Sequence, residues 1–69
     1  MNIDAYLSSG RCVASAYRKP SIIKNAKVRA YLWHDTRDCG GIYERLEEWM
    51  RIVQLEQGNE TVSFRIRKA

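Results

Sequence analysis

Residues 40–67, GGIYERLEEWMRIVQLEQGNETVSFRIR, contain the pattern on which the predicted fold depends. Gly40 and Gly41 interrupt the preceding segment, and the spacing of the apolar residues after them predicts an amphipathic helix that begins near Gly41 and runs for about four turns. Glycine just past a last turn accepts the left-handed conformation that ends many helices, so we expect the helix to end at Gln57-Gly58-Asn59. The apolar side of this helix is predicted to consist of Ile42, Leu46, Trp49, Met50 and Val53.

The segment after the helix has the period of a strand. Val62, Phe64 and Ile66 alternate with polar or basic residues, which include Arg65 and Arg67. Alternation of this kind predicts one apolar face and one polar-basic face. The helix therefore joins two strands, which are either parallel neighbours linked by a right-handed crossover or placed so that the last strand is antiparallel to its neighbours.

A further strand precedes the helix, over residues 27–34. Here an aliphatic set of side chains, Val28, Ala30 and Leu32, alternates with a basic and aromatic set, Arg29, Tyr31 and Trp33. Because successive side chains of a strand point to opposite faces, the first set is predicted to face the core and the second to face away from it.

The N-terminal residues predict a hairpin. Residues 3–7 alternate as a half-buried strand does, the turn residues Ser8-Ser9-Gly10 follow, and residues 11–18 form a second arm whose inward face is left open. A short helix over residues 2–8 stays open as an alternative, since so short a segment cannot separate the two periods. Pro20 predicts a loop over residues 19–26, with Ile22 and Ile23 against the core.

Together these segments predict a single α+β domain over residues 1–69, with strands, then a helix, then a strand. We expect a small antiparallel or mixed sheet of three to four strands, with the one amphipathic helix packed on one face and the strand order left open. The predicted core joins two sets of side chains. They are Val28, Ala30, Leu32, Val62, Phe64 and Ile66 from the sheet and Leu46, Trp49, Met50 and Val53 from the helix.

Length and composition limit the class of protein. A chain of 69 residues forms one domain, and 45% hydrophobic with 29% charged residues is typical of a globular protein, not of a disordered or membrane-spanning one. No apolar run approaches the roughly 20 residues that cross a bilayer, and the N-terminus lacks the order of a secretory signal, so we expect a cytoplasmic protein with no membrane partner. Cys12 and Cys39 are predicted to be reduced thiols, with a single bridge between them left open.

The net charge of +4 is unevenly distributed along the chain. Residues 1–38 contain seven Lys or Arg against three Asp, whereas residues 41–60 contain five Glu against two Arg. Arg65, Arg67 and Lys68 then follow with no acid. The predicted helix is therefore acidic and its surroundings are basic. The acidic helix face, which includes Glu44 in the first turn, is typical of a solvated surface helix.

One helix covers only one face of a sheet, so the other face is the predicted binding site. It is expected to present Arg29, Tyr31, Trp33, Arg65 and Arg67, with Tyr6 or Tyr17 as further candidates. An exposed aromatic patch on so small a protein indicates an interface. Arg, Tyr and Trp are enriched at protein hot spots, and the same residues stack on unpaired bases and neutralise phosphates. Three partners stay open: a protein or nucleoprotein complex, nucleic acid, or a second copy that buries Tyr31 and Trp33.

Catalytic and metal chemistry have little support in the sequence. Residues 34–39, HDTRDC, are the one place where metal-ligating or catalytic groups crowd together. Zinc sites need three or four ligands at recognised spacings, and no second Cys or His pair completes one. Neither glycine pattern of the nucleotide-binding motifs is present at Gly40-Gly41. We therefore expect a binding protein that is not an enzyme and that has no catalytic residues, metal or cofactor.

The chain resembles, in its size, its single helix on a small sheet and its mixed charged surfaces, the small inhibitor proteins of bacteriophages and mobile elements, among them the anti-CRISPR inhibitors. This resemblance covers no motif, so no functional residue is carried over. It implies a stoichiometric blocker without enzymatic activity in the host cell cytoplasm. Such a protein would dock on a protein or nucleoprotein complex such as a CRISPR effector, with direct nucleic-acid binding by the basic aromatic face as the alternative.

Overall fold

The computed structural model describes residues 1–21, 30–37 and 40–67. Within these ranges the chain forms an α+β fold in which one helix packs on an antiparallel sheet of five strands, where three to four were predicted. The elements in chain order are β1 (Asn2–Leu7), β2 (Cys12–Ser21), β3 (Ala30–Asp35), β4 (Ile42–Tyr43), α1 (Leu46–Gln57) and β5 (Val62–Arg67). The additional strand is β4, which the sequence placed inside the helix.

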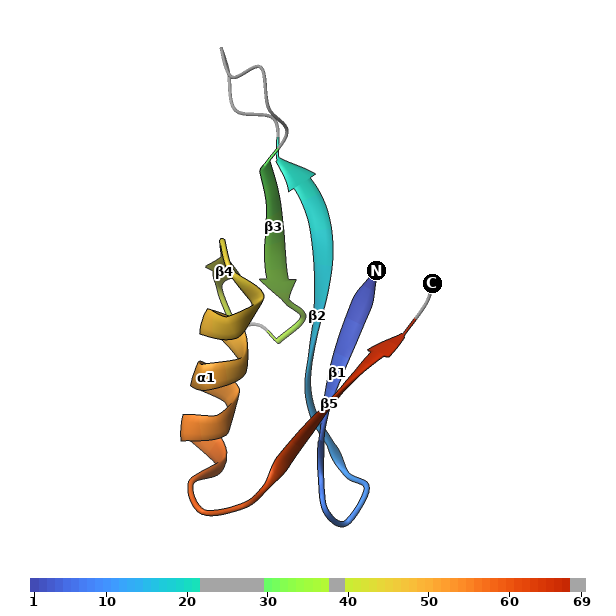
Figure 1. The fold of residues 1–69 in the computed structure, drawn as a ribbon, viewed down its shortest axis with the longest axis vertical. Coiled ribbons are helices and arrows are strands. Elements are labelled where there is room, and N and C mark those ends of the chain that lie inside the picture. The colour runs from blue at the N-terminus through green and yellow to red at the C-terminus, as the bar shows by residue number, and fades with distance from the viewer. Residues whose placement is uncertain (22–29, 38–39, 68–69) are drawn as a thin grey trace.

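The strand order in the sheet is β4-β3-β2-β1-β5. The two strands that flank α1 in sequence, β4 and β5, are therefore at opposite edges, and the helix with its loops connects these edges along one side of the sheet (Figure 1). Every neighbouring pair of strands is antiparallel. This topology decides between the two arrangements that the sequence left open, because β5 pairs with the first strand and is antiparallel to it.

The N-terminal hairpin is confirmed, and residues 2–7 form a strand, not the alternative short helix. The turn closes with hydrogen bonds from Leu7 N to Arg11 O and from Gly10 N to Leu7 O, both 2.9 Å. Gly10 has a φ of 89°, which glycine adopts at little cost. The register of β1 and β2 shifts beyond Ala5, so Tyr6 lies opposite Cys12.

The second arm of the hairpin is longer than predicted, because β2 includes Lys19, Pro20 and Ser21, which the sequence assigned to a loop. Beyond Arg18, β2 pairs with β3 alone, so its other side is a free sheet edge among the described strands. Proline is tolerated at such an edge because its missing N–H removes no hydrogen bond of the sheet. The predicted positions of Ile22 and Ile23 fall outside the described residues.

The helix begins at Leu46 and not near Gly41. Residues Ile42 and Tyr43 instead pair with β3, and Gly41, with a φ of 76°, turns the chain into this short strand. Ile42 is 60% exposed and does not belong to the apolar side of the helix, while Glu47 and Glu48 occupy the first turn that was assigned to Glu44. The predicted end at Gly58 is confirmed.

The core lies between α1 and one face of the sheet. Trp49 and Val53 are fully buried, and the Trp49 ring meets Phe64 edge-on at 5.7 Å between centroids. The buried apolar residues are Ile3, Ala5, Ala14, Ala16, Trp33, Trp49 and Val53, and Leu46, Met50, Val62 and Phe64 pack against them. Ile66 was also predicted in the core, but it is 64% exposed because β5 forms the sheet edge.

The faces of β3 are opposite to those predicted. Trp33 is 8% exposed and belongs to the core, whereas Leu32 is opposite Lys19 on the far face of the sheet. The reason is Asp35, which shares the inward face with Trp33 and accepts a hydrogen bond of 2.9 Å from Trp49 Nε1. Since side chains alternate, the burial of Asp35 turns Leu32 outward. Of the other predicted core residues, Val28 lies outside the described residues.

Candidate functional site

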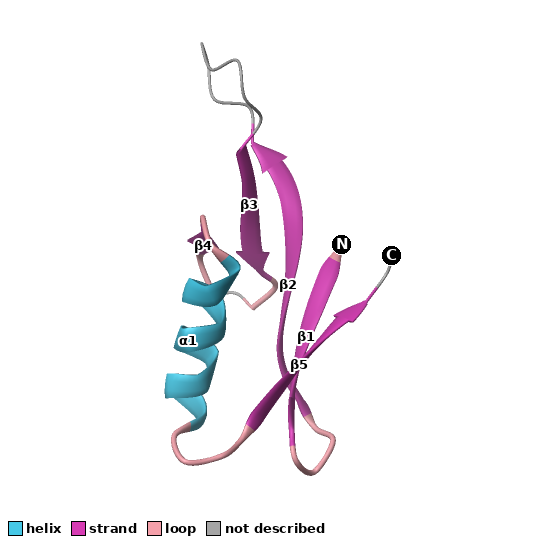
Figure 2. Ribbon diagram, in the orientation of Figure 1, coloured by secondary structure: helices cyan, strands magenta, loops and turns pink. Residues whose placement is uncertain are grey.

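The face of the sheet opposite α1 is the candidate site. Strand register determines its members, because Tyr17 is opposite His34, and Asp4 is opposite both Ser15 and Arg65. Among the described elements, only α1 packs on the sheet, and it packs on the other side (Figure 2). We call this surface the open face. Its main residues are Asp4, Tyr6, Ser15, Tyr17, Lys19, Leu32, His34, Ser63, Arg65 and Arg67.

Two aromatic rings form a stack in the middle of the open face. Tyr17 of β2 and His34 of β3 are register partners, and their rings are nearly parallel, with an interplanar angle of 11° and centroids 5.1 Å apart. Across the other side of Tyr17, β1 places the short side chain of Asn2. Tyr17 keeps 38% of its surface exposed. The exposed part of Tyr17 is therefore accessible to a partner.

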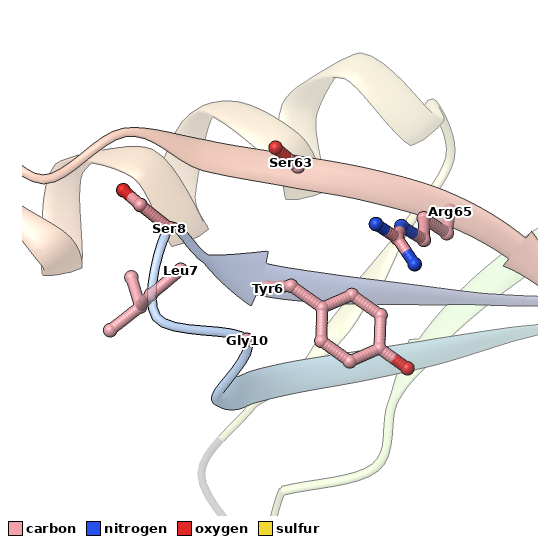
Figure 3. Close-up of a pocket in the computed structure, with 6 residues that line it drawn as sticks. All are labelled: Tyr6, Leu7, Ser8, Gly10, Ser63 and Arg65. Atoms are coloured by element: carbon pink, nitrogen blue, oxygen red, sulfur yellow. The ribbon is translucent and has the colours of Figure 1, made fainter.

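A third ring lies near the turn of the hairpin. Figure 3 shows Tyr6 from β1 and Arg65 from β5 beside one another at a hollow of about 280 Å³. The Arg65 guanidinium lies 5.5 Å from the centroid of the Tyr6 ring, within the range of a cation–π contact. The other residues that line the hollow are Leu7, Ser8, Gly10 and Ser63. This corner of the open face thus combines a ring with a cation.

A buried carboxylate links the strands under the open face. Asp4 is 6% exposed, and its oxygens accept hydrogen bonds from Ser15 Oγ at 2.7 Å and from Arg67 Nη2 at 3.3 Å. Arg67 also forms an ion pair with Asp4, with its Nε 3.2 Å from the carboxylate. Tyr6 OH also donates to it, at 3.4 Å. The negative charge of Asp4 raises the pKa of Tyr6 above its usual value. Arg67 in turn neutralises Asp4.

The residues predicted for the site are divided between the two faces. Arg65 and Arg67 lie on the open face, and so do Tyr6 and Tyr17, the further candidates. Tyr31 and Trp33 lie on the face toward the helix. Arg29 falls outside the described residues. Trp33 is 8% exposed and is already buried by the chain itself.

Tyr31 has its own surroundings away from the open face. It is 49% exposed, near the start of β3, and the Arg18 guanidinium lies 4.7 Å from the centroid of its ring. Two members of the open face, His34 and Lys19, were not among the residues predicted for the site. His34 was missed because the wrong phase was assigned to β3, and Lys19 was missed because residues 19–26 were predicted as a loop.

The two layers of the molecule differ in charge. Over the described residues, the open face has the cations Lys19, Arg65 and Arg67 and one acid, Asp4, which is buried and paired. The glutamates belong to α1 and its flanking turns. The hollow of about 540 Å³ on the helix surface is lined by Arg45, Glu47, Glu48 and Arg51, whose charges cancel. Among the described residues, positive charge therefore predominates on the open face.

Residues 34–37, at the end of β3 and just after it, have a structural role. His34 points to the open face, while Asp35 points into the core, where Arg37 Nη2 lies 2.7 Å from its carboxylate. Arg37 also forms an ion pair with Glu56 of α1. Asp35 and Arg37 thus join the end of β3 to the helix. No cluster of three metal-ligating side chains occurs in the parts of the chain that the structure describes, and Asp38 and Cys39 lie outside them.

Cys12 lies on the open face as an exposed free thiol, with its Sγ 3.7 Å from Ser15 Oγ. Its predicted partner in a bridge, Cys39, lies outside the described residues. Within those residues, α1 is too short and too polar to span a membrane.

No family model, curated protein or solved structure matched the chain. The case for function therefore rests on the geometry and charge of the open face.

The buried Asp35 predicts a dependence of stability on pH. Burial raises the pKa of Asp35, but the hydrogen bonds from Arg37 and Trp49 outweigh burial and hold this pKa below its usual value. A carboxyl with a lowered folded pKa stabilises the fold above its unfolded pKa of about 3.9, and the stabilisation is lost as pH falls through the folded pKa. We expect the melting temperatures of the parent chain and Asp35→Asn to differ at pH 7, and this difference to shrink progressively as pH falls below about 4 toward the lower folded pKa. A constant difference from pH 7 to pH 3 would contradict this role.

Proposed function

We propose that the chain is a non-enzymatic binding module that occupies the anionic surface of a partner, of the kind that a nucleoprotein complex presents, with its open face. The observation that supports this most directly is the arrangement of Tyr6, the Tyr17–His34 stack and Arg65 on a sheet face that no described element covers. Exposed aromatic patches on small proteins mark interfaces.

The sign of the partner's charge follows from the cations of the open face. Arg67 is engaged with Asp4, whereas Lys19 and Arg65 have no acidic partner among the described residues. The glutamates of α1 lie in the other layer, so an anionic surface that approached the helix side would meet no comparable excess of positive charge among the described residues. Complementary potentials of this kind orient a partner during encounter and select against the wrong face.

The test compares two variants with equal loss of charge. Lys19→Gln with Arg65→Gln removes two cations from the open face, and Arg45→Gln with Arg51→Gln removes two exposed cations from the helix layer. Binding of heparin is measured at several salt concentrations, with the circular dichroism of each variant as the control for folding. We expect the open-face variant to have lower affinity for heparin. We also expect the slope of its log affinity against log salt to be smaller by about 2, because binding makes two fewer ionic contacts and so releases about two fewer counterions.

The helix-layer variant is expected to bind heparin as the parent chain does. Equal loss of affinity in the two variants would mean that net charge alone drives binding, and the proposed open face would then be wrong.

A further inference from the structure

The aromatic side chains of the open face form two separate stations. The first is the Tyr17–His34 stack, and Tyr17 is aligned with Asn2 at the start of β1. The second is Tyr6, near the other end of β1, so the two stations are roughly 13 Å apart at about 3.3 Å per residue. Both project from strands that pair with their neighbours, and although the register of β1 with β2 shifts between Ala5 and Tyr6, the register of β1 with β5 is unbroken through Tyr6.

Cations lie beside both stations. Arg65 contacts the Tyr6 ring, and Arg67 is aligned with Asn2 and hence with the row that contains Tyr17 and His34. Lys19 lies two residues beyond Tyr17 on the same face of β2. A ligand that follows the strands of the open face thus meets rings and positive charges together, with the carboxylate of Asp4 already neutralised by Arg67.

The combination of aromatic rings and cations on the open face favours the binding of unpaired bases over that of a duplex. In a duplex, the faces of the bases are covered by their neighbours, so that a duplex would use the cations of the open face and leave its rings without a partner. A single strand exposes both its phosphates and its base faces, and aromatic side chains on open sheets stack on such bases whatever their sequence. A base on the outer side of Tyr17 would extend an existing stack over the small side chain of Asn2.

We propose that the anionic partner of the open face is single-stranded nucleic acid, with one base on the Tyr17–His34 stack, another on Tyr6, and phosphates at Arg65 and Lys19. This inference rests on the proposed function, since it names the partner of the same surface. Stacking of bases on the Tyr17–His34 stack and on Tyr6 adds affinity to that supplied by the cations.

The experiment is a fluorescence-anisotropy titration of labelled single-stranded DNA and RNA of about 12 nucleotides, a length within the range that small single-strand-binding domains cover. The same sequence as a duplex is titrated beside them at low and at moderate salt. We expect the single strands to bind more tightly than the duplex. Tyr17→Leu and Tyr6→Leu are each expected to weaken single-strand binding about tenfold, because a stacked base is lost.

The matched control is Tyr31→Leu, which makes the same chemical change at an exposed tyrosine on the opposite face of the sheet. It is expected to leave the affinity unchanged. Tyr17→Phe keeps the ring and is expected to bind single strands as the parent chain does. Loss with leucine and recovery with phenylalanine would assign the effect to stacking and not to a folding defect.

Two outcomes would overturn the inference while the proposed function stands. If heparin binding depends on the open-face cations but the duplex binds as tightly as the single strand, the rings have no role in recognition. If Tyr17→Leu and Tyr6→Leu bind single strands as the parent does, the partner is another anion, such as an acidic protein surface. Failure of the heparin test itself would instead remove the proposed function.

Discussion

Replacing Trp49 by alanine is expected to lower the free energy of unfolding by about 3 to 5 kcal/mol, the usual cost of truncating a large buried aromatic side chain. Trp49 is fully buried, it packs edge-on against Phe64, and its Nε1 donates to Asp35 at 2.9 Å. Small domains have about 0.05 to 0.15 kcal/mol of stability per residue, or about 3.5 to 10 kcal/mol for a chain of 69 residues, so this substitution would remove a large part of the total stability.

The measurement is urea unfolding followed by far-ultraviolet circular dichroism. Leu55→Ala is the control, because Leu55 belongs to the same helix but is 71% exposed, and it is expected to change the free energy of unfolding by no more than about 0.5 kcal/mol. Trp49→Phe retains most of the volume but removes the donor to Asp35, which predicts an intermediate cost of about 1 to 3 kcal/mol. Similar midpoints for Trp49→Ala and Leu55→Ala would contradict the position of the core.

Gly40→Ala is expected to cost about 3 kcal/mol or more, although it adds a single methyl group. A Cβ at Gly40 would overlap with Cγ and Cβ of Asp35, whose side chain is fully buried. Either the backbone of residues 40 and 41 or the carboxylate must then move. Movement of Asp35 would break its hydrogen bonds with Arg37 and Trp49 and leave buried polar groups without partners.

Gly10→Ala separates this steric effect from the general cost of replacing a glycine. Gly10 has a φ of 89°, but a Cβ added there would meet no atom within 4 Å, so only the left-handed backbone is penalised, at about 1 to 2 kcal/mol. Thermal melting of both variants gives the comparison. If Gly40→Ala were no more destabilising than Gly10→Ala, this result would contradict the close approach of Gly40 to the Asp35 side chain.

Local signals in the sequence predicted most of the elements. The turn at Ser8-Ser9-Gly10, the alternation over residues 62–66 and the helix stop at Gly58 all depend on neighbouring residues, and each is confirmed. The helix start was wrong because Ile42 fits the apolar spacing of a helix as well as it fits a strand. Pairing of Ile42 and Tyr43 with β3 decided between them, and that pairing is not a local property.

The sequence predicted that the uncovered face of the sheet is basic and aromatic, but it predicted only some of the residues that lie on this face. A basic and aromatic uncovered face was expected, and Arg65 and Arg67 lie on it. Trp33 was assigned to that face because alternation gives the period of a strand but not its phase. His34 was missed for the same reason, since it shares the face of Leu32.

The sequence by itself determined the class of fold, the single helix and its end, and the hairpin, because glycine turns and hydrophobic periods act within a few residues. Only the tertiary structure decided which face of β3 is buried, where the helix begins, and which rings meet on the open face. The physical reason is that hydrogen bonds from Trp49 of α1, 14 residues later, and from Arg37 hold the carboxylate of Asp35 inward. These contacts accompany the position of Trp33 in the core and of His34 beside Tyr17.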